Sequence, residues 1–145
     1  MSVRKIIEAK QIQKIITVKP DDTVKSVAEL LAKHKIGAVI VSGDGAIVDG
    51  ILSERDIVRA LGTVGVDCLA GRVSDLMTAS VIGCRPDDTA NSVMEKMTDG
   101  RFRHMPVIED NRMIGVISIG DVVKARLAEI EHENSALTGM IANSW

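Results

Sequence analysis

Aromatic residues are almost missing from this chain. Of its 145 residues only Phe102 and Trp145 are aromatic, and there is no tyrosine. Proteins that bind RNA or single-stranded DNA commonly stack the bases on aromatic side chains, so the composition argues against that class. The charges agree, because 18 Lys plus Arg against 20 Asp plus Glu give a net charge of −2. Such a balance provides no general attraction for a nucleic-acid backbone, and we expect no nucleic-acid partner.

Cysteines are few, and long apolar runs are missing. Cys68 and Cys84 are not part of a CxxC pair or a histidine cluster, which argues against a zinc site. Two such thiols fit a reducing compartment. No apolar run approaches the roughly 18–20 residues of a membrane span, and the first residues lack the apolar core of a signal peptide. These features predict a cytoplasmic protein with no membrane partner.

An internal repeat is the most informative feature that is present. Residues 20–23 (Pro-Asp-Asp-Thr) return as residues 86–89. Each copy precedes apolar residues at helical spacing, and these are Val24, Val27, Ala28 and Leu31 in the first copy and Ala90, Val93, Met94 and Met97 in the second. The pattern predicts one amphipathic helix in each copy, begun by Asp/Thr capping residues.

The other predicted elements also occur in the same order in both copies. Each repeat reads as strand, helix, two strands and a second helix. The strands are expected at 15–18, 38–41 and 47–52, and at 80–83, 105–108 and 113–117. One repeat of about 50 residues buries too little surface to be stable alone. The sequence therefore predicts an α+β (α/β) fold in which two β-α-β-β-α repeats pack sheet to sheet.

The repeat also sets the expected boundaries. Repeat 1 covers residues 8–61, a glycine-containing linker covers 62–74, and repeat 2 covers 75–127. A C-terminal extension, 128–145, continues the last helix to about Leu137. Val123, Leu127, Ile130 and Leu137 recur there at helical intervals. This stripe predicts a surface for a partner helix or for the flank of the domain itself.

The motif Ser-x-x-Asp opens the second helix of both repeats, as Ser53 with Asp56 and as Ser118 with Asp121. One interpretation is a capping box, in which serine and acid satisfy the first amides of the helix. The other is a ligand site. A carboxylate accepts hydrogen bonds from vicinal hydroxyls such as those of a ribose, and the serine and helix N-terminus favour phosphate. The spacing leaves both interpretations open, because one aspartate is able to serve both at different times.

Residues 101–106 (Arg-Phe-Arg-His-Met-Pro) form the second informative stretch. In an extended strand Arg101 and Arg103 share one face, and Phe102 and His104 share the other. Guanidinium and imidazolium groups together suit a phosphate, whereas the alternative is a solvated start of a strand. The matching residues 35–38 (Lys-Ile-Gly-Ala) are small and mostly apolar. We therefore expect repeat 2 to supply most phosphate contacts and repeat 1 a wall for a flat base.

No motif in the chain proposes an enzyme. GxxxxGK[ST], HExxH and GxSxG do not occur, and residues 43–45 (Gly-Asp-Gly) lack the third glycine of a dinucleotide fingerprint. Those two glycines are interpreted as a hairpin turn. The sequence thus suggests no nucleophile, base or metal set.

Together the motifs resemble the tandem CBS domain pair, or Bateman module, over about residues 8–130. The resemblance depends on the repeated Pro-Asp-Asp-Thr start, the small apolar second strand and the Gly-x-x-Ser-x-x-Asp end of each repeat. Residues 53–59 and 101–104 are similar to those of small stand-alone bacterial CBS-pair proteins. One departure is Ile40, at the position where repeat 2 has Pro106, and it affects the strand more than ligand chemistry. The resemblance implies two pseudo-twofold related repeats with two clefts between their sheets, and an extended C-terminal helix.

The resemblance also implies a ligand site in each cleft. Asp56 and Asp121 hold ribose hydroxyls, and Ser53 and Ser118 lie near ribose or phosphate. Residues at strand starts meet the base and phosphates, and these are Ile36, Gly37, Ala38, Arg103, His104 and Met105. Backbone at 13–17 and 77–79 borders the base, which adds Gln13, Ile16, Thr17, Met77, Thr78 and Ala79. Residues beside these motifs complete the predicted site, namely Arg55, Phe102 and Pro106.

The role implied by the resemblance is that of a non-catalytic regulatory module. It senses AMP, ADP, ATP, NAD(H) or S-adenosylmethionine, each as a ligand and not as a catalytic cofactor, and it binds no metal. The family commonly pairs two modules into a flat disc, so we expect a homodimer and an unidentified downstream protein. The alternative is a structural dimer scaffold in which Ser-x-x-Asp is only a helix cap. A nucleotide hydrolase is a third hypothesis.

Overall fold

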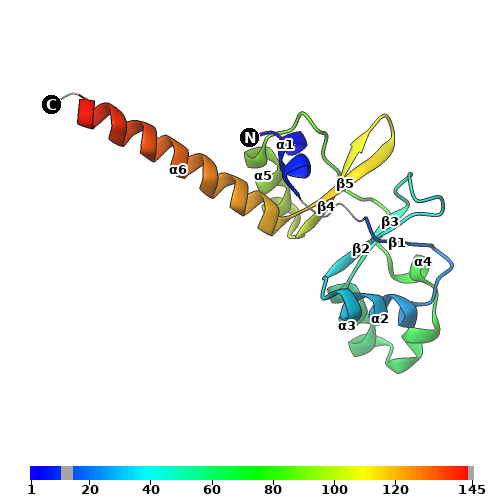
Figure 1. Ribbon diagram of the computed structural model, residues 1–145. Helices are drawn as coiled ribbons and strands as arrows, with labels where there is room; N and C mark the ends of the chain where they lie inside the picture. The colour runs from blue at the N-terminus through cyan, green and yellow to red at the C-terminus, as the bar shows by residue number, and fades with distance from the viewer. Residues whose placement is uncertain (11–14, 144–145) are drawn as a thin grey trace.

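A computed structural model of the chain describes residues 1–10 and 15–143, with side chains described as far as Leu137 (Figure 1). The elements follow in the order α1 (Val3–Ala9), β1 (Thr17–Val18), α2 (Val24–His34), β2 (Ala38–Val41), β3 (Gly50–Ser53), α3 (Glu54–Thr63), a 3-10 helix η1 (Val66–Ala70), α4 (Val73–Leu76), α5 (Ala90–Gly100), β4 (His104–Glu109), β5 (Arg112–Ser118) and α6 (Ile119–Asn143). The predicted mixed fold of two repeats and a long C-terminal helix is confirmed.

Repeat 1 has a three-stranded sheet in the order β1-β2-β3, parallel between β1 and β2 and antiparallel between β2 and β3. Its strand β2 has the predicted bounds, but the strand predicted at 47–52 begins only at Gly50. The turn before β3 extends over more residues than the apolar pattern suggests. The Asp44 carboxylate accepts the amides of Ala46 and Ile47 at 2.9 Å, and the hydroxyl of Ser42 donates to the carbonyl of Ile47. These bonds hold Ile47 in the loop.

Repeat 2 has a two-stranded sheet, β4-β5, and the opening strand predicted at 80–83 is wrong. Only an isolated parallel bridge joins Cys84 to Val107. The amide of Cys84 donates to the carbonyl of Pro106 at 3.0 Å, and the amide of Ile108 donates to the carbonyl of Cys84 at 2.8 Å. The next rung of a parallel ladder needs an N–H from residue 106. Proline has none, so pairing stops after one bridge.

The short helices before each repeat pack on the opposite repeat. No element is predicted before residue 8, yet Val3 and Ile6 of α1 lie in the core of repeat 2. Helix α4 falls partly in the predicted linker, and its Val73 lies in the core of repeat 1. The same backbone pattern holds both helices, because an isolated antiparallel β-bridge joins Ser2 to Thr89 and another joins Arg72 to Thr23. This exchange ties the two repeats together.

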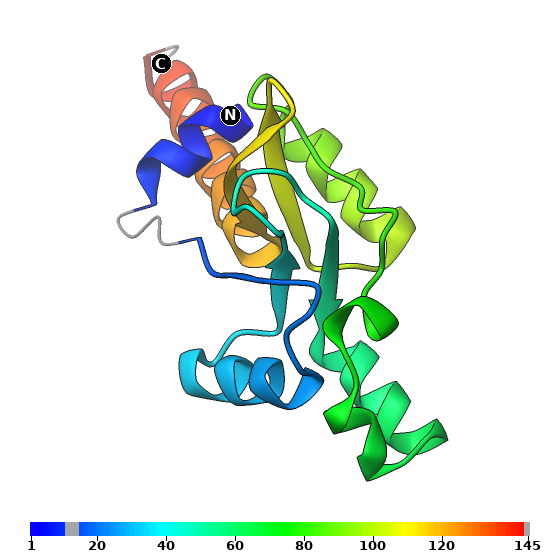
Figure 2. The ribbon, with the colours of Figure 1, turned by 90° about the vertical axis from the view of Figure 1, so that its right-hand side faces the viewer.

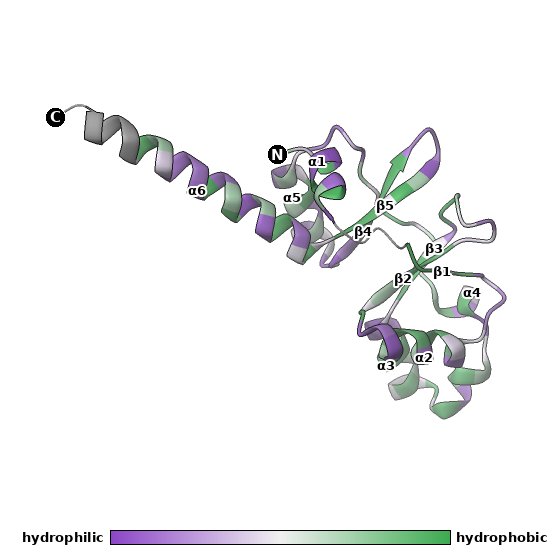
Figure 3. Cartoon of the chain, in the orientation of Figure 1, coloured by the Kyte–Doolittle hydropathy of each residue, from purple (hydrophilic) through white to green (hydrophobic). Residues whose placement is uncertain are grey.

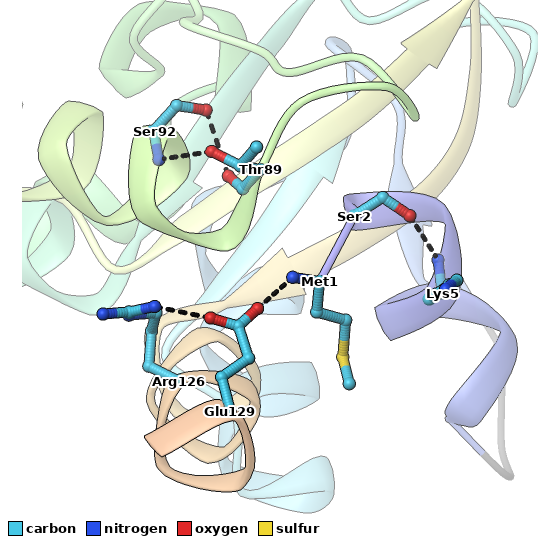
Figure 4. A network of polar contacts seen from close by, with 7 residues as sticks. All are labelled: Met1, Ser2, Lys5, Thr89, Ser92, Arg126 and Glu129. Atoms are coloured by element: carbon cyan, nitrogen blue, oxygen red, sulfur yellow. Dashed lines mark hydrogen bonds and ion pairs between the residues drawn. The ribbon is translucent and has the colours of Figure 1, made fainter. Parts of the chain in front are cut away.

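The first residues of the chain are also tied to α6 (Figure 4). The amino group of Met1 forms an ion pair with Glu129, and Arg126 pairs with the same carboxylate. Nearby, Thr89 caps α5 through the amide of Ser92 at 3.1 Å. Helix α1 therefore lies beside the first half of α6 (Figure 2). None of the described helices combines the length and apolar character that a membrane crossing needs.

Candidate functional site

Two cavities lie where the repeats meet. The first, which we call the Asp121 cleft, has a volume of about 310 Å³. Its walls are mainly aliphatic residues of repeat 1, and they are Ile15, Ile16, Ile36, Val39, Ile40 and Ile51. Ser118 and Val116 of repeat 2 complete it together with Lys10. Asp121 itself does not line the cavity, but it bonds to two residues that do, Lys10 and Ser118.

Asp121 already has a partner within this cleft. The ammonium of Lys10 lies 2.9 Å from Oδ2 of Asp121 and also donates to the carbonyl of Val116 at 2.9 Å. Burial alone would raise the pKa of Asp121, but the hydrogen bond from the amide of Ser118 and the charge of Lys10 outweigh burial and lower it. The carboxylate is therefore ionised and paired at neutral pH.

The second cavity, which we call the Asp56 cleft, is larger, with a volume of about 800 Å³. Repeat 1 supplies Ser53 and Asp56 at the start of α3. Repeat 2 supplies the segment from Gly100 to His104, together with Thr78, Ser80, Val81 and Ile82. Volumes of about 300–1,000 Å³ are usual for small-molecule sites. The Asp56 cleft has room for a ligand of nucleotide size.

Positive charge gathers in the Asp56 cleft. Four arginines line it, namely Arg55, Arg59, Arg101 and Arg103. The acidic residues that line it are Glu54 and Asp56. The balance favours an anion, and guanidinium groups donate well to phosphate oxygens. Two of these arginines come from repeat 1 and two from repeat 2, whereas the sequence suggests that repeat 2 supplies most of the positive charge. The apolar wall of repeat 1 lies mostly in the other cleft.

Both Ser-x-x-Asp motifs form capping boxes. The amide of Ser53 donates to Oδ2 of Asp56 at 3.0 Å, and the amide of Asp56 donates back to the Ser53 hydroxyl at 3.3 Å. Ser118 and Asp121 repeat the pair, at 2.9 and 3.2 Å. The capping interpretation is confirmed. Every hydrogen bond that a described residue donates to the carboxylate of Asp56 or Asp121 goes to Oδ2. The cap therefore leaves Oδ1 of each carboxylate for another donor.

His104 lies at the boundary of the two clefts and lines both. The side chain is half-buried, and this burial lowers the pKa of His104 from its ordinary value, even though the charge of Asp121 opposes the shift. Burial thus favours the neutral imidazole over the imidazolium that the sequence suggests beside Arg103. The neutral ring still offers one donor and one acceptor.

The segment 101–104 is not the alternating strand that its sequence suggests. Arg101 ends α5 in a left-handed conformation with φ of 56°, and β4 begins only at His104. The ring of Phe102 folds back over Gly100, where any Cβ would collide with it. As a result Arg101, Phe102 and Arg103 all line the Asp56 cleft. The helix end, not strand alternation, directs these side chains.

The structure brings most of the predicted site residues to the clefts. Those lining the Asp121 cleft are Ile16, Ile36, Ala38, His104 and Ser118. Those lining the Asp56 cleft are Gly37, Ala38, Ser53, Arg55, Asp56, Thr78, Phe102, Arg103 and His104. Asp121 reaches the first cleft through its bonds to Ser118 and Lys10. Each cleft thus combines the motif of one repeat with the strand start of the other.

Other predicted site residues lie elsewhere. Met105 is fully buried in the core of repeat 2, and Pro106 is buried beside it, because alternation along β4 turns Met105 inward. Thr17 pairs with β2, and Met77 packs against the core of repeat 1 and against Gly50. Ala79 is exposed and lines neither cleft. Gln13 lies outside the described residues.

Several cleft residues are missed by the sequence interpretation. Lys10 is the most important, and nothing near it in the sequence marks it, because its partner Asp121 is distant along the chain. Arg59 lies one turn after Arg55 on α3, so helical spacing from the motif could have found it. The residues from Ser80 to Ile82 enter the Asp56 cleft because the predicted strand there does not form.

Comparison with known proteins places this geometry in a family. A family model for the CBS domain matches residues 4–63 and 73–128. The CBS domain-containing protein CBSX3, mitochondrial, of Arabidopsis thaliana is 36% identical over 129 residues, which cover 86% of this chain and 63% of the relative. The chain thus spans less than two thirds of that relative's length.

Solved structures share the fold. The CBS-domain containing protein ATU1752 from Agrobacterium tumefaciens is 45% identical, with a TM-score of 0.81 over 87% of this chain and 99% of the other. The CBS domain pair of protein MJ0100, solved in complex with 5-methylthioadenosine and S-adenosyl-L-methionine, is 23% identical, with a TM-score of 0.75 over 89% of this chain and 98% of the other. The family model covers both repeats, and the chain therefore belongs to the CBS domain family as a tandem pair.

Proposed function

We propose that this chain is a non-catalytic regulatory module that binds an adenosyl ligand in the Asp56 cleft. The candidates are AMP, ADP, ATP, NAD(H) and S-adenosylmethionine. The observation that carries the proposal is the composition of that cleft. A helix-capping carboxylate from repeat 1 shares one cavity with four arginines and with Phe102. A nucleotide presents the matching groups, namely vicinal hydroxyls, phosphates and a flat base.

The contacts divide naturally among these groups. Asp56 accepts from ribose hydroxyls through Oδ1, while Oδ2 keeps the cap of α3 intact. Arg103 and the neighbouring arginines receive the phosphates, because charge-assisted hydrogen bonds to phosphate are stronger than neutral ones. The base lies against Phe102 and the aliphatic surface of Ala38 and Ile51. Specificity for the nucleoside thus comes from the carboxylate, and charge adds affinity for anionic ligands.

The relatives support this ligand class. MJ0100 was solved with two adenosyl compounds, and tandem CBS pairs are regulatory modules. In this chain we expect ligand occupancy to be transmitted to a downstream protein, with the module acting as a cytoplasmic homodimer. The Asp121 cleft is a weaker site in this proposal, because the ion pair with Lys10 already offsets the charge of the Asp121 carboxylate and makes Oδ1 a weaker acceptor for ribose hydroxyls.

Isothermal titration calorimetry tests the proposal. AMP, ATP, NADH and S-adenosylmethionine are titrated into wild type, into Asp56→Ala and into Asp75→Ala. Asp75 is the matched control, because its carboxylate accepts the amide of Arg72 at the start of α4 and lines neither cleft. We expect at least one ligand to bind wild type and Asp75→Ala equally, and Asp56→Ala to lose about 1.5–3 kcal/mol of binding free energy.

A structural scaffold is the second candidate, favoured by the complete capping boxes in both repeats. In that case Asp56→Ala lowers stability by about 0.5–2 kcal/mol through the lost cap, and no ligand of the panel binds wild type. Thermal shift separates the two, since a ligand at about 100 times its Kd adds about 2.7 kcal/mol of stability. Absence of any shift with all four ligands would contradict the adenosyl proposal.

A further inference from the structure

One face of helix α6 packs against repeat 2, and the opposite face is exposed. Val122 is fully buried and Ala125 nearly so, and both pack into the core of repeat 2. Glu129 holds the amino group of Met1 (Figure 4). Beyond this contact the helix continues to Asn143 and projects away from the two repeats (Figure 1). Along this projecting part, the side chains of residues 131–137 are all exposed.

An apolar stripe follows the exposed face. Val123 and Ile130 are each 41% exposed, and Leu127 and Leu137 are each 56% exposed. Together with Asn134 they recur at alternating intervals of four and three residues. This is the a/d pattern of a heptad repeat, with Leu127 and Asn134 at a positions and the other three at d positions. Figure 3 shows apolar and polar residues alternating along the projecting helix.

A helix with this stripe needs a partner in water. Isolated helices shorter than about 12–15 residues are marginal, and most helical stability comes from packing an apolar face. Residues 131–137 of α6 are exposed and have no such packing within the part of the chain whose side chains are described. Four large aliphatic side chains on one line also exceed the scattered exposure expected of an ordinary surface.

We propose that this stripe is the interface with a second copy of the chain, formed by parallel pairing of the two α6 helices. Charge supports a second copy. Arg126 precedes the stripe at a g position and Glu131 follows at an e position. In a parallel pair the g residue of one helix faces the e residue of the next heptad in the other. Arg126, which pairs with Glu129 of its own helix, then also lies near Glu131 of the opposite helix and attracts it, twice per dimer.

Asn134 selects the parallel direction. In a parallel pair an a residue faces the same a residue of the other helix, so the two Asn134 amides can hydrogen-bond to each other. In an antiparallel pair an a residue faces a d residue, and Asn134 would be buried against an aliphatic side chain without a partner. An unpaired buried amide is costly. The proposal does not depend on ligand binding, and it differs from the flat pairing of modules that the family resemblance implies.

Disulfide trapping tests the geometry. Leu137→Cys places a thiol at a d position, where parallel pairing brings the two copies together, and Ala128→Cys places one on an exposed position outside the stripe. The native thiols do not interfere, since Cys68 and Cys84 are buried and burial raises the pKa of Cys84 to about 12. With oxidised glutathione we expect Leu137→Cys to form a covalent dimer and Ala128→Cys to remain monomeric on denaturing gels. Equal cross-linking of both variants, or of neither, would overturn the proposal.

Sedimentation velocity of uncharged and charged variants gives an independent test. Leu127→Glu should weaken self-association about tenfold or more, because it buries a carboxylate at an a position, whereas Asn134→Leu should tighten it. Leu127 is exposed, so the fold is retained and nucleotide binding by calorimetry stays unchanged. A wild type that is monomeric at its highest soluble concentration, or a dimer unaffected by Leu127→Glu, would contradict the interface and leave the proposed ligand site unaffected.

Discussion

The ammonium of Lys10 and the carboxylate of Asp121 form an ion pair at 2.9 Å beside the Asp121 cleft, which Lys10 lines. Lys10 follows α1, which packs on repeat 2, whereas Asp121 belongs to the motif that the resemblance assigns to ribose binding. The corresponding Asp56 has no cation within salt-bridge distance among the described residues. Two motifs of identical spacing therefore present different surfaces to a ligand.

Removing the charge of Lys10 should raise the affinity of the Asp121 cleft for a ligand that carries a ribose. Lys10→Met keeps the aliphatic length of the side chain and removes the ion pair, while the amide of Ser118 still donates to Oδ2 of Asp121. We expect the affinity for adenosine at this site to rise up to about fivefold, since a partly exposed ion pair contributes about 0–1 kcal/mol. Adenosine is the right probe because it carries the ribose and no phosphate. Loss of the positive charge of Lys10 therefore does not itself weaken its binding. Calorimetry on Lys10→Met measures the change.

Lys5→Met is the control for this prediction, because Lys5 is exposed on α1 and lines neither cleft. It should leave adenosine affinity unchanged. If Lys10→Met binds adenosine more weakly than wild type does, then Lys10 contacts the ligand directly and does not compete with it.

Arg103 should matter only for ligands that carry phosphate. Arg103→Gln removes one guanidinium from the Asp56 cleft, and hydrogen bonds to charged groups contribute about 1.5–3 kcal/mol. We expect affinity for AMP or ATP to fall about tenfold or more, while adenosine affinity stays unchanged. The salt dependence of ATP binding should also weaken, because part of the attraction is charge–charge. Arg85→Gln, exposed and outside both clefts, should behave as wild type.

His104 should make stability depend on pH near neutrality. Burial lowers the pKa of His104 in the folded chain, whereas the unfolded chain keeps a value near 6.5. The unfolded state therefore binds more protons between these two values, and stability is lost as pH falls through about 6.5. Urea unfolding at pH ~7.5 and ~5.5 measures the loss. His104→Gln should reduce it, and the same change at exposed His34 should not.

Any side chain in place of Gly50 at the start of β3 should lower the free energy of unfolding. A Cβ there would lie 2.7 Å from Sδ of Met77 and 2.9 Å from the carbonyl oxygen of Thr78. The backbone cannot move aside easily, since Ile51 and Thr78 exchange two hydrogen bonds of 3.0 and 2.9 Å. We expect Gly50→Ala to cost about 1–3 kcal/mol of unfolding free energy, measured by urea denaturation.

Gly62 provides the contrast. It lies in α3, and a Cβ there meets nothing within 4 Å. Gly62→Ala should raise stability by about 0.5–1 kcal/mol, because alanine loses less backbone entropy in a helix. Equal effects of the two substitutions would show that close contact at Gly50 is not the cause.

The helices were predictable wherever the signal was local. Thr23 and Thr89 cap α2 and α5 as the repeated Pro-Asp-Asp-Thr suggests, and the apolar spacing places Val27 and Val93 in the two cores. These features depend on residues within one or two helical turns, which is the range over which capping and periodicity operate.

The duplication, the helices α2, α3, α5 and α6 and the positions of Asp56 and Asp121 can be read from the sequence, because each depends on short-range pattern. Which side chains share a cleft depends on the packing of the two repeats. That packing pairs the motif of each repeat with the strand start of the other, and it brings Lys10 to Asp121 across the chain. It also lowers the pKa of His104 by burial. Such contacts depend on how two sheets meet, and no local period or spacing records that.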